Sequence, residues 1–174
     1  KAIYDHPRNL PDDLLLRIAE DGGVIQGNAL GAYLEALVPT PERAAGLAKI
    51  GEEFGTDFAS MSPETIAKVR AARGELDKIH PAPRSTFEKY MEHLLYTIEL
   101  VGIDHVGIGA DWDGGGGVDG MSDITDLPKV TQALLDAGYN EEDLAKFWGG
   151  NMMRLMRDVE AAKTSDIGSP DVVN

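Results

Sequence analysis

The 174-residue chain contains no cysteine, so it has neither a disulfide framework nor a thiolate ligand for a metal. Any metal site in it must use histidine and carboxylate side chains. Basic residues are also scarce, because 16 lysines and arginines accompany 30 acidic residues and the formal charge is -14. Such a surface repels phosphate backbones and anionic lipids, which excludes nucleic acid as an expected partner. Small molecules or peptides are the expected ligands.

Long apolar runs are absent as well. No stretch of about eighteen apolar residues is present to span a membrane, and the opening residues KAIYDHPRNL lack the apolar core of a signal peptide. Aromatic residues make up only 6% of the chain, but the hydrophobic fraction of 43% is ordinary for a globular protein. We therefore expect a folded domain rather than disorder.

Short apolar runs alternate with longer amphipathic segments, which is the pattern of βα units. A helix is predicted over residues 11–20, where Asp21-Gly22-Gly23 ends it, and a strand over residues 24–28. A second strand is predicted over residues 105–109. Further helices are predicted over residues 87–102, 126–138, 140–150 and 151–162, with Asn140 as an N-cap.

Residues 39–80 form a segment that is too long for an ordinary connection. It contains PERAAGLAKIGEEF and SPETIAKVRAARGELDKI, and each piece has a proline where the first helical turn tolerates one. We interpret the segment as a helical insertion that forms part of a lid or an oligomer contact. Residues 163–174 are predicted to be a polar tail.

Two convincing strands are too few for a self-contained sheet. A (β/α)₈ barrel needs roughly 250 residues, and the order of elements resembles its last βα units. The predicted fold class is therefore α/β, with residues 1–162 as the C-terminal part of a TIM barrel whose N-terminal portion is expected to precede Lys1.

The stretch HVGIGADWDGGGGVDG places Asp111 directly after the second predicted strand. Catalytic groups of such barrels lie at the carboxyl ends of strands. We expect Asp111 to be desolvated there and to act as an acid, a base or a metal partner. Glycines 114–117 are expected to form a flexible rim without side chains, past which a substrate could approach.

GADWDGGGG resembles the GxDFDG segment of the membrane (renal) dipeptidase family, which are zinc peptidases with an amidohydrolase-like barrel fold. DHPRNLPDDLL resembles the family's RNxxDDxL region. VIQGN, followed by Tyr33, resembles its VNFY strand and nearby tyrosine. NEEDLAKFWGGNMMRLMRDVE resembles its closing helices, so the resemblance covers residues 1 to about 162 in order.

The resemblance implies zinc-dependent hydrolysis of dipeptides, including those with a C-terminal D-residue. It implies that Asp111 carries a proton between the metal-activated water and the leaving amine, and that Arg8 holds the substrate carboxylate, for which a guanidinium is well suited. Tyr33 is implied to line the substrate pocket. Asn28 and Asp113 take supporting roles.

The resemblance also implies two zinc ions, held in the family by a His-x-Asp pair, a bridging glutamate and two later histidines. All of these ligands would precede Lys1, so no metal ligand is expected in this chain. His6, His80, His93 and His105 have no metal-binding spacing. Expected partners are the missing N-terminal portion and a second copy in a homodimer. Because family members are often exported, a periplasmic or extracellular location is the expectation.

Two alternatives remain open. Arg8 could be a surface residue in a weak ion pair with nearby acids. Asp111, Asp113, Gly116 and Asp119 occupy positions 1, 3, 6 and 9 of an EF-hand calcium loop, although Ser122 stands where the loop needs glutamate. The competing hypothesis is therefore a non-enzymatic calcium-binding or ligand-binding domain.

Overall fold

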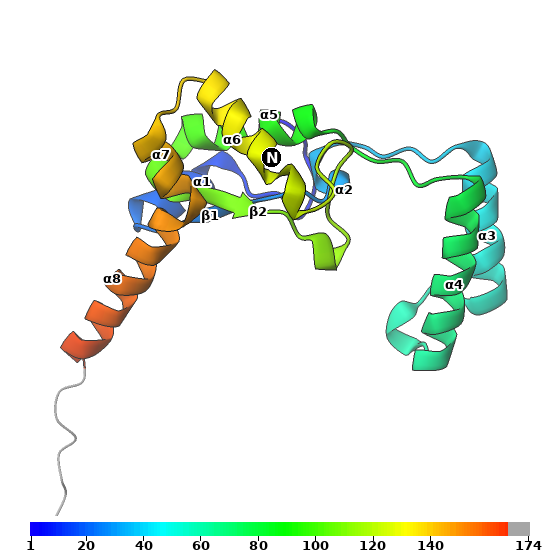
Figure 1. Cartoon of the computed structure of the whole chain (residues 1–174). Coiled ribbons are helices and arrows are strands. Elements are labelled where there is room, and N and C mark those ends of the chain that lie inside the picture. Colours follow the sequence, from blue (N-terminus) through cyan, green and yellow to red (C-terminus); the bar gives the residue numbers. More distant parts are fainter. Residues whose placement is uncertain (167–174) are drawn as a thin grey trace, which may run out of the picture. The chain divides into compact units, whose positions relative to one another are not determined.

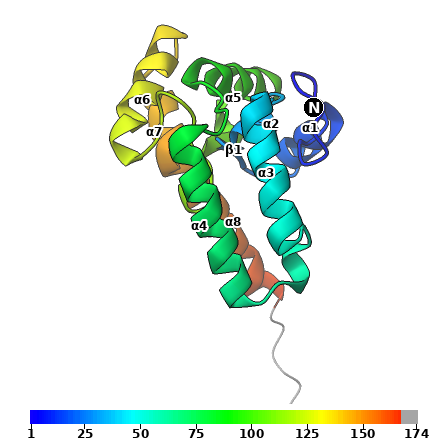
Figure 2. The same cartoon turned by 90° about the vertical axis from the view of Figure 1, so that its right-hand side faces the viewer.

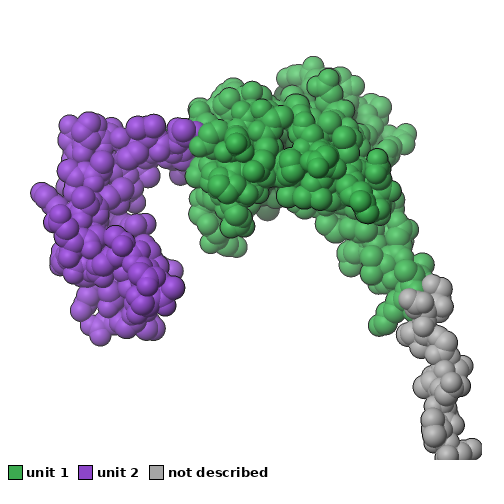
Figure 3. Space-filling model, turned by 180° about the vertical axis from the view of Figure 1, so that it is seen from behind, with its two compact units in different colours: residues 1–35, 85–174 green, residues 36–84 purple. Residues whose placement is uncertain are grey.

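The structure of the protein is a computed structural model, and it describes residues 1–166 (Figure 1). The chain divides into two compact units, which are coloured separately in Figure 3. Unit 1 comprises residues 1–35 and 85–174, and unit 2 comprises residues 36–84. No helix within the described residues is long and apolar enough to cross a membrane.

Unit 1 is built on two parallel strands, β1 (Ile25–Asn28) and β2 (Val106–Gly109). Their register pairs Ile25 with Val106 and Asn28 with Gly109, so the carboxyl ends of the strands lie side by side. The helices that precede, separate and follow them are α1 (Asp12–Glu20), α2 (Gly31–Leu34), α5 (Phe87–Val101), α6 (Leu127–Asp136), α7 (Glu141–Ala145) and α8 (Asn151–Asp166).

Helix α5 supplies much of the core of unit 1. The hydroxyl of Thr86 accepts a hydrogen bond from the N–H of Lys89 and caps the helix, and Gly102 ends it with a φ of +85°. Its buried residues recur at helical spacing and contact both α1 and β2. They are Tyr90, Met91, Leu94 and Ile98, and they join one cluster with Val106, Val130 and Phe147.

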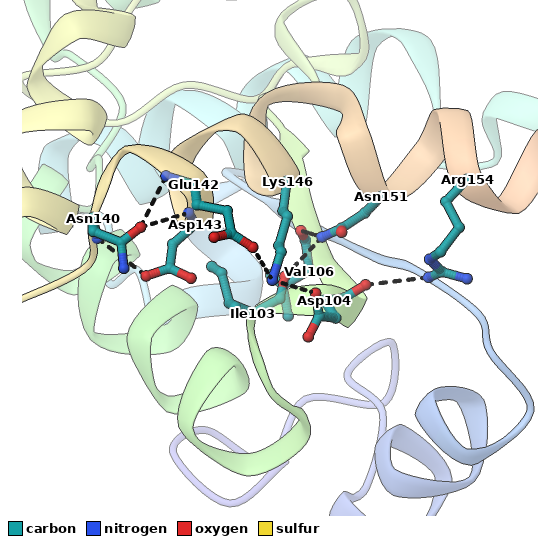
Figure 4. Close-up of polar contacts among 9 residues, drawn as sticks. All are labelled: Ile103, Asp104, Val106, Asn140, Glu142, Asp143, Lys146, Asn151 and Arg154. Atoms are coloured by element: carbon teal, nitrogen blue, oxygen red, sulfur yellow. Dashed lines mark hydrogen bonds and ion pairs between the residues drawn. The ribbon is translucent and has the colours of Figure 1, made fainter.

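The closing helices are tied to the start of β2 by polar side chains (Figure 4). The amide of Asn151, which is buried, donates to the carbonyl oxygens of Ile103 at 2.7 Å and Val106 at 2.9 Å. Arg154 donates to the carbonyl oxygen of Asp104, and Lys146 forms an ion pair with the carboxylate of the same residue at 3.0 Å. Asn151 and Arg154 of α8 therefore satisfy backbone carbonyl groups at the amino end of β2, and Lys146 adds an ion pair to a side chain there.

Unit 2 is a pair of helices, α3 (Pro41–Phe54) and α4 (Pro63–Ile79), which contact each other (Figure 2). Thr40 and Ser62 cap them, each followed by the proline of the first turn. Among the described residues of unit 2 only Arg43 and Val69 are buried. The guanidinium of Arg43 forms an ion pair with Asp77 at 2.6 Å and donates to the carbonyl oxygen of His80.

The predicted helices and both predicted strands are confirmed, with ends that lie within five residues of the predicted ones. The short helix α2 and a π-helical turn over Lys146–Gly150 were not predicted from the sequence. Helix α8 continues to Asp166, so the first residues of the predicted tail are helical, and the rest of that tail lies outside the described residues. The interpretation of residues 39–80 as an insertion in a barrel stays a prediction.

Candidate active site

Asn28 and Asp111 meet at the carboxyl ends of the two strands. Asn28 is the last residue of β1, and Asp111 lies two residues beyond the end of β2. The Nδ2 of Asn28 donates to the Oδ2 of Asp111 at 3.1 Å, while its Oδ1 accepts from the N–H of Leu30 at 2.7 Å. Because the second hydrogen bond fixes the orientation of the amide, Asn28 presents an N–H to the carboxylate.

The glycines that follow Asp111 are held close to it. Asp111 has a φ of +59°, a left-handed conformation that aspartate tolerates better than most residues. A Cβ at Gly114 would lie 2.1 Å from the Oδ1 of Asp111, and a Cβ at Gly116 would lie 2.3 Å from the carbonyl oxygen of Ala110. The N–H of Gly116 donates to the carbonyl oxygen of Asp111 at 2.7 Å. Glycine is therefore a steric requirement at these two positions, and the flexibility of the rim and its role in substrate approach stay predictions.

Asp111 is exposed in this chain, which contributes two parallel strands to the fold. Its desolvation in a complete barrel stays a prediction. A cavity of about 400 Å³ lies beside it, lined by Ile108, Ala110, Asp111, Trp112, Asp113 and Leu127. The indole N–H of Trp112 is buried and has no hydrogen-bond partner among the described residues, so it is an available donor near Asp111.

Arg8 and Tyr33, both predicted from the sequence, lie together. The guanidinium carbon of Arg8 is 5.7 Å from the centroid of the Tyr33 ring, and the ring of His6 is 4.8 Å from the same centroid. The predicted alternative of a surface ion pair is not found, since Arg8 forms no salt bridge within residues 1–166. Its hydrogen-bond donors are consequently available to an anion.

A cavity of about 300 Å³ connects this pair to the strand end. Its lining includes Arg8, Tyr33, Asn28 and His93. Asn28 therefore contributes to this cavity and contacts Asp111 as well. The structure thus brings the predicted residues into two adjoining groups that share Asn28, while Asp113 lines the other cavity beside Asp111.

Two residues that line this cavity, Tyr90 and His93, have pKa values shifted by burial. Burial raises the pKa of Tyr90, whose hydroxyl donates to the carbonyl oxygen of Gly27 at 3.2 Å. Burial also lowers the pKa of His93, and the opposing hydrogen bond from its Nε2 to the carbonyl oxygen of Leu34, at 2.9 Å, is the smaller influence. A Cβ at Gly27 would lie 2.9 Å from Leu94, so glycine on β1 admits the side chains of α5.

Within residues 1–166, no group of three or more histidine, aspartate or glutamate side chains gathers to hold a metal ion. The proposed calcium loop at Asp111, Asp113 and Asp119 therefore has no support in the structure. Sequence reasoning missed the contacts of Asn9 with the carbonyl of Tyr33 and the steric role of Gly114. The adjacency of Asn9 to Arg8 was the one available signal.

The sequence matches the membrane dipeptidase family (Peptidase family M19) over residues 1–168. The chain belongs to this family. Its members include a dipeptidase, tcpJ, from Claviceps purpurea, which is 35% identical over 96% of this chain and 29% of its own length. Dipeptidase ataJ from Aspergillus terreus is 39% identical over 91% of this chain and 28% of its own length.

Solved structures of dipeptidases have the same fold over this region. The probable dipeptidase PvdM from Pseudomonas aeruginosa superposes with a TM-score of 0.63 at 33% identity, covering 88% of this chain and 41% of that protein. A metallopeptidase from Rhodobacter sphaeroides, bound to a phosphinate mimic of L-Ala-D-Ala, gives a TM-score of 0.57 at 26% identity, covering 90% of this chain and 33% of that protein. The chain therefore spans less than half the length of these relatives, and it has an α/β fold similar to this part of the dipeptidases.

Proposed function

We propose that this chain is part of a metal-dependent dipeptidase in which Asp111 carries a proton and Arg8 holds the carboxylate of the substrate. The observation that carries the proposal is the convergence at Asn28, which contacts Asp111 and lines the cavity that contains Arg8 and Tyr33. Family membership supports the reaction class. The phosphinate mimic of L-Ala-D-Ala bound to the Rhodobacter relative supports D-residues at the C-terminal position.

Asp111 is suited to proton transfer by its surroundings. Its Oδ2 accepts a hydrogen bond from Asn28, which holds the carboxylate in one orientation, and the exposed carboxylate is open to water and substrate. Hydrolysis of an amide needs a base for the attacking water and an acid for the leaving amine. One carboxylate performs both tasks by taking the proton first and releasing it later.

Arg8 is suited to the substrate carboxylate because its planar guanidinium can bind both oxygens at once. The ring of Tyr33 lies beneath it and leaves its N–H groups free. A terminal carboxylate fixed at Arg8 would place the scissile bond one residue before the C-terminus, as hydrolysis of a dipeptide requires.

The described residues do not supply a metal ligand set, and we propose that two zinc ions are held by residues outside these 174. Metal in this reaction class makes water acidic enough to attack a carbonyl. The same proposal places residues 1–162 in the C-terminal part of a TIM barrel, with residues 39–80 inserted. We also propose that the complete protein is exported and that it forms a homodimer.

Asp111→Asn in the full-length, metal-loaded protein tests the proposal. The amide can still contact Asn28 but cannot accept a proton, so we expect dipeptide turnover to fall by about 10²-fold or more with metal content unchanged. Arg8→Ala should raise KM for dipeptides and leave kcat within a few-fold. Full activity in Asp111→Asn would exclude the proton-transfer role, and an unchanged KM in Arg8→Ala would exclude the carboxylate role.

A further inference from the structure

The residue next to Arg8 joins two segments that are distant in the sequence. The Nδ2 of Asn9 donates one hydrogen bond to the carbonyl oxygen of Tyr4 at 3.0 Å and another to the carbonyl oxygen of Tyr33 at 2.7 Å. Both amide hydrogens are therefore used. Since Tyr33 lies 24 residues further along the chain, this side chain is a direct link between the N-terminal loop and α2.

The loop that carries Arg8 has few other constraints. It precedes α1 and contains no helix or strand. Its turn is closed by two hydrogen bonds to His6, from the N–H of Asn9 to the carbonyl at 3.0 Å and from the N–H of Arg8 to Nδ1 at 3.1 Å. These bonds shape the turn but do not attach it to α2. The ring of His6 also contacts that of Tyr33, and Asn9 supplies the side-chain hydrogen bond between the loop and α2.

Asn9 holds the backbone of Tyr33, while the guanidinium of Arg8 lies over the ring of the same residue. The separation of Arg8 from Tyr33 therefore depends on the amide of Asn9. Asn9 itself is half-buried, and its amide donates to the carbonyl oxygens of Tyr4 and Tyr33 rather than to Asp111. A change at Asn9 is therefore expected to affect the binding of the substrate carboxylate at Arg8 rather than proton transfer at Asp111.

We propose that Asn9 is a positioning residue, which holds Arg8 against Tyr33 and thereby sets the affinity for the substrate carboxylate. This inference rests on the proposed function, because it assumes that Arg8 binds the carboxylate. An aspartate at this position would direct oxygen toward both carbonyl groups and would place a negative charge beside Arg8. An alanine would remove both donors without adding charge.

The experiment measures dipeptide hydrolysis by the full-length, metal-loaded protein with Asn9→Ala and Asn9→Asp. We expect KM to rise about tenfold in Asn9→Ala, the equivalent of roughly one net hydrogen bond, and further in Asn9→Asp, while kcat changes less than threefold in Asn9→Ala. Asn140→Asp is the matched control, because Asn140 caps α7 through an oxygen that aspartate also provides. It should leave KM and kcat unchanged.

A double-mutant cycle with Arg8→Ala separates positioning from general destabilisation. If Asn9 acts through Arg8, Asn9→Ala should have no further effect on kcat/KM when Arg8 is already alanine. Equal effects in both backgrounds would overturn the inference, as would an unchanged KM in the folded Asn9→Ala protein. Should Asn9→Ala not fold, Asn9→Ser, whose hydroxyl keeps one donor, replaces it in the same cycle. Absence of dipeptide turnover in the unmodified protein would instead overturn the proposed function.

Discussion

The contacts that stabilise unit 1 internally and those that stabilise unit 2 internally differ in the sequence separation of the residues they join. In unit 2, Thr40 and Ser62 are the N-caps of the two helices, and the hydroxyl of each accepts a hydrogen bond from the backbone N–H three residues later. In unit 1, Asn28 contacts Asp111 across 83 residues, and Arg154 contacts the carbonyl of Gly22 across 132 residues. Unit 2 is thus defined largely by local signals, while the candidate site in unit 1 depends on distant ones.

The two units also differ in how many of their residues are buried, and unit 1 has the larger core. The core of unit 1 is one continuous cluster of apolar residues that includes residues of β2 and α5 and Ala29, which directly follows β1. In the described part of unit 2, the buried residues are Val69 and a charged one, Arg43. The comparison indicates that a small error in packing should disturb function in unit 1 and only local stability in unit 2.

The largest expected effect is the loss of activity in Gly114→Ala, a substitution in unit 1. Its Cβ would lie 2.1 Å from the Oδ1 of Asp111, so the carboxylate or the loop must move. If the proposed function holds, kcat/KM for dipeptides should fall by about 10²-fold, which is the effect of a displaced catalytic group.

Gly74→Ala in unit 2 is the matched control for that substitution. Gly74 lies inside α4, and a Cβ there would meet nothing within 4 Å. Alanine should stabilise the helix by about 0.5 to 1 kcal/mol and leave activity unchanged. Full activity in Gly114→Ala would mean that the close approach of glycine to Asp111 has no catalytic importance.

Asn151→Ala should have the largest effect on the stability of unit 1. It leaves the buried carbonyl group of Val106 and the half-buried carbonyl group of Ile103 without their shared donor, at a cost of about 2 to 3 kcal/mol. The measurement is urea unfolding followed by tryptophan fluorescence, because Trp112 and Trp148 both lie in unit 1. Lys146→Ala removes partly exposed ion pairs nearby and should cost less than about 1 kcal/mol. Equal losses in the two variants would contradict this account.

Asp77→Ala tests whether a contact within unit 2 stabilises only that unit. It leaves the buried guanidinium of Arg43 with the carbonyl of His80 but without its carboxylate, which should cost about 1 kcal/mol because Asp77 is half exposed. Hydrogen exchange should accelerate over residues 41–79 and stay unchanged in unit 1. Glu75→Ala, which breaks an exposed pair with Lys78, is the control and should change little. Faster exchange in β1 or β2 would contradict local stabilisation.

The sequence was sufficient for the elements whose signals are local. Periodic apolar residues predicted α5, and proline with a preceding hydroxyl predicted the starts of α3 and α4. The position of Asp111 beyond a strand was predictable for the same reason, since apolar residues and glycines mark the end of β2.

The geometry of the site was not predictable from local patterns. The contact of Asn28 with Asp111 joins residues 83 positions apart, and the contact of Asn9 with Tyr33 joins separate segments. The π-helical turn at Lys146–Gly150 follows from Gly149, which has non-helical backbone angles that a hydrophobic pattern does not reveal. Family resemblance identified Arg8 and Asp111 as important but contained no information on what holds them.

The smallest predicted effect is a pH dependence of stability that belongs to unit 1. Burial lowers the pKa of His93, outweighing the hydrogen bond to the carbonyl of Leu34 and the nearby carboxylate of Glu92, both of which raise it. The folded state therefore favours neutral His93, so its contribution to stability is complete above the unfolded pKa of about 6.5 and is lost as the pH falls through the lower folded pKa.

The midpoint of urea unfolding, followed by tryptophan fluorescence, should accordingly decrease between about pH 7.5 and 5.5. His93→Gln should reduce this dependence, because glutamine can donate an N–H to Leu34 but does not titrate. His80→Gln, at the end of α4 in unit 2, should leave it intact. An unchanged slope in His93→Gln would assign the pH dependence to other groups of unit 1, and a loss of slope in His80→Gln would show that the two units do not respond separately.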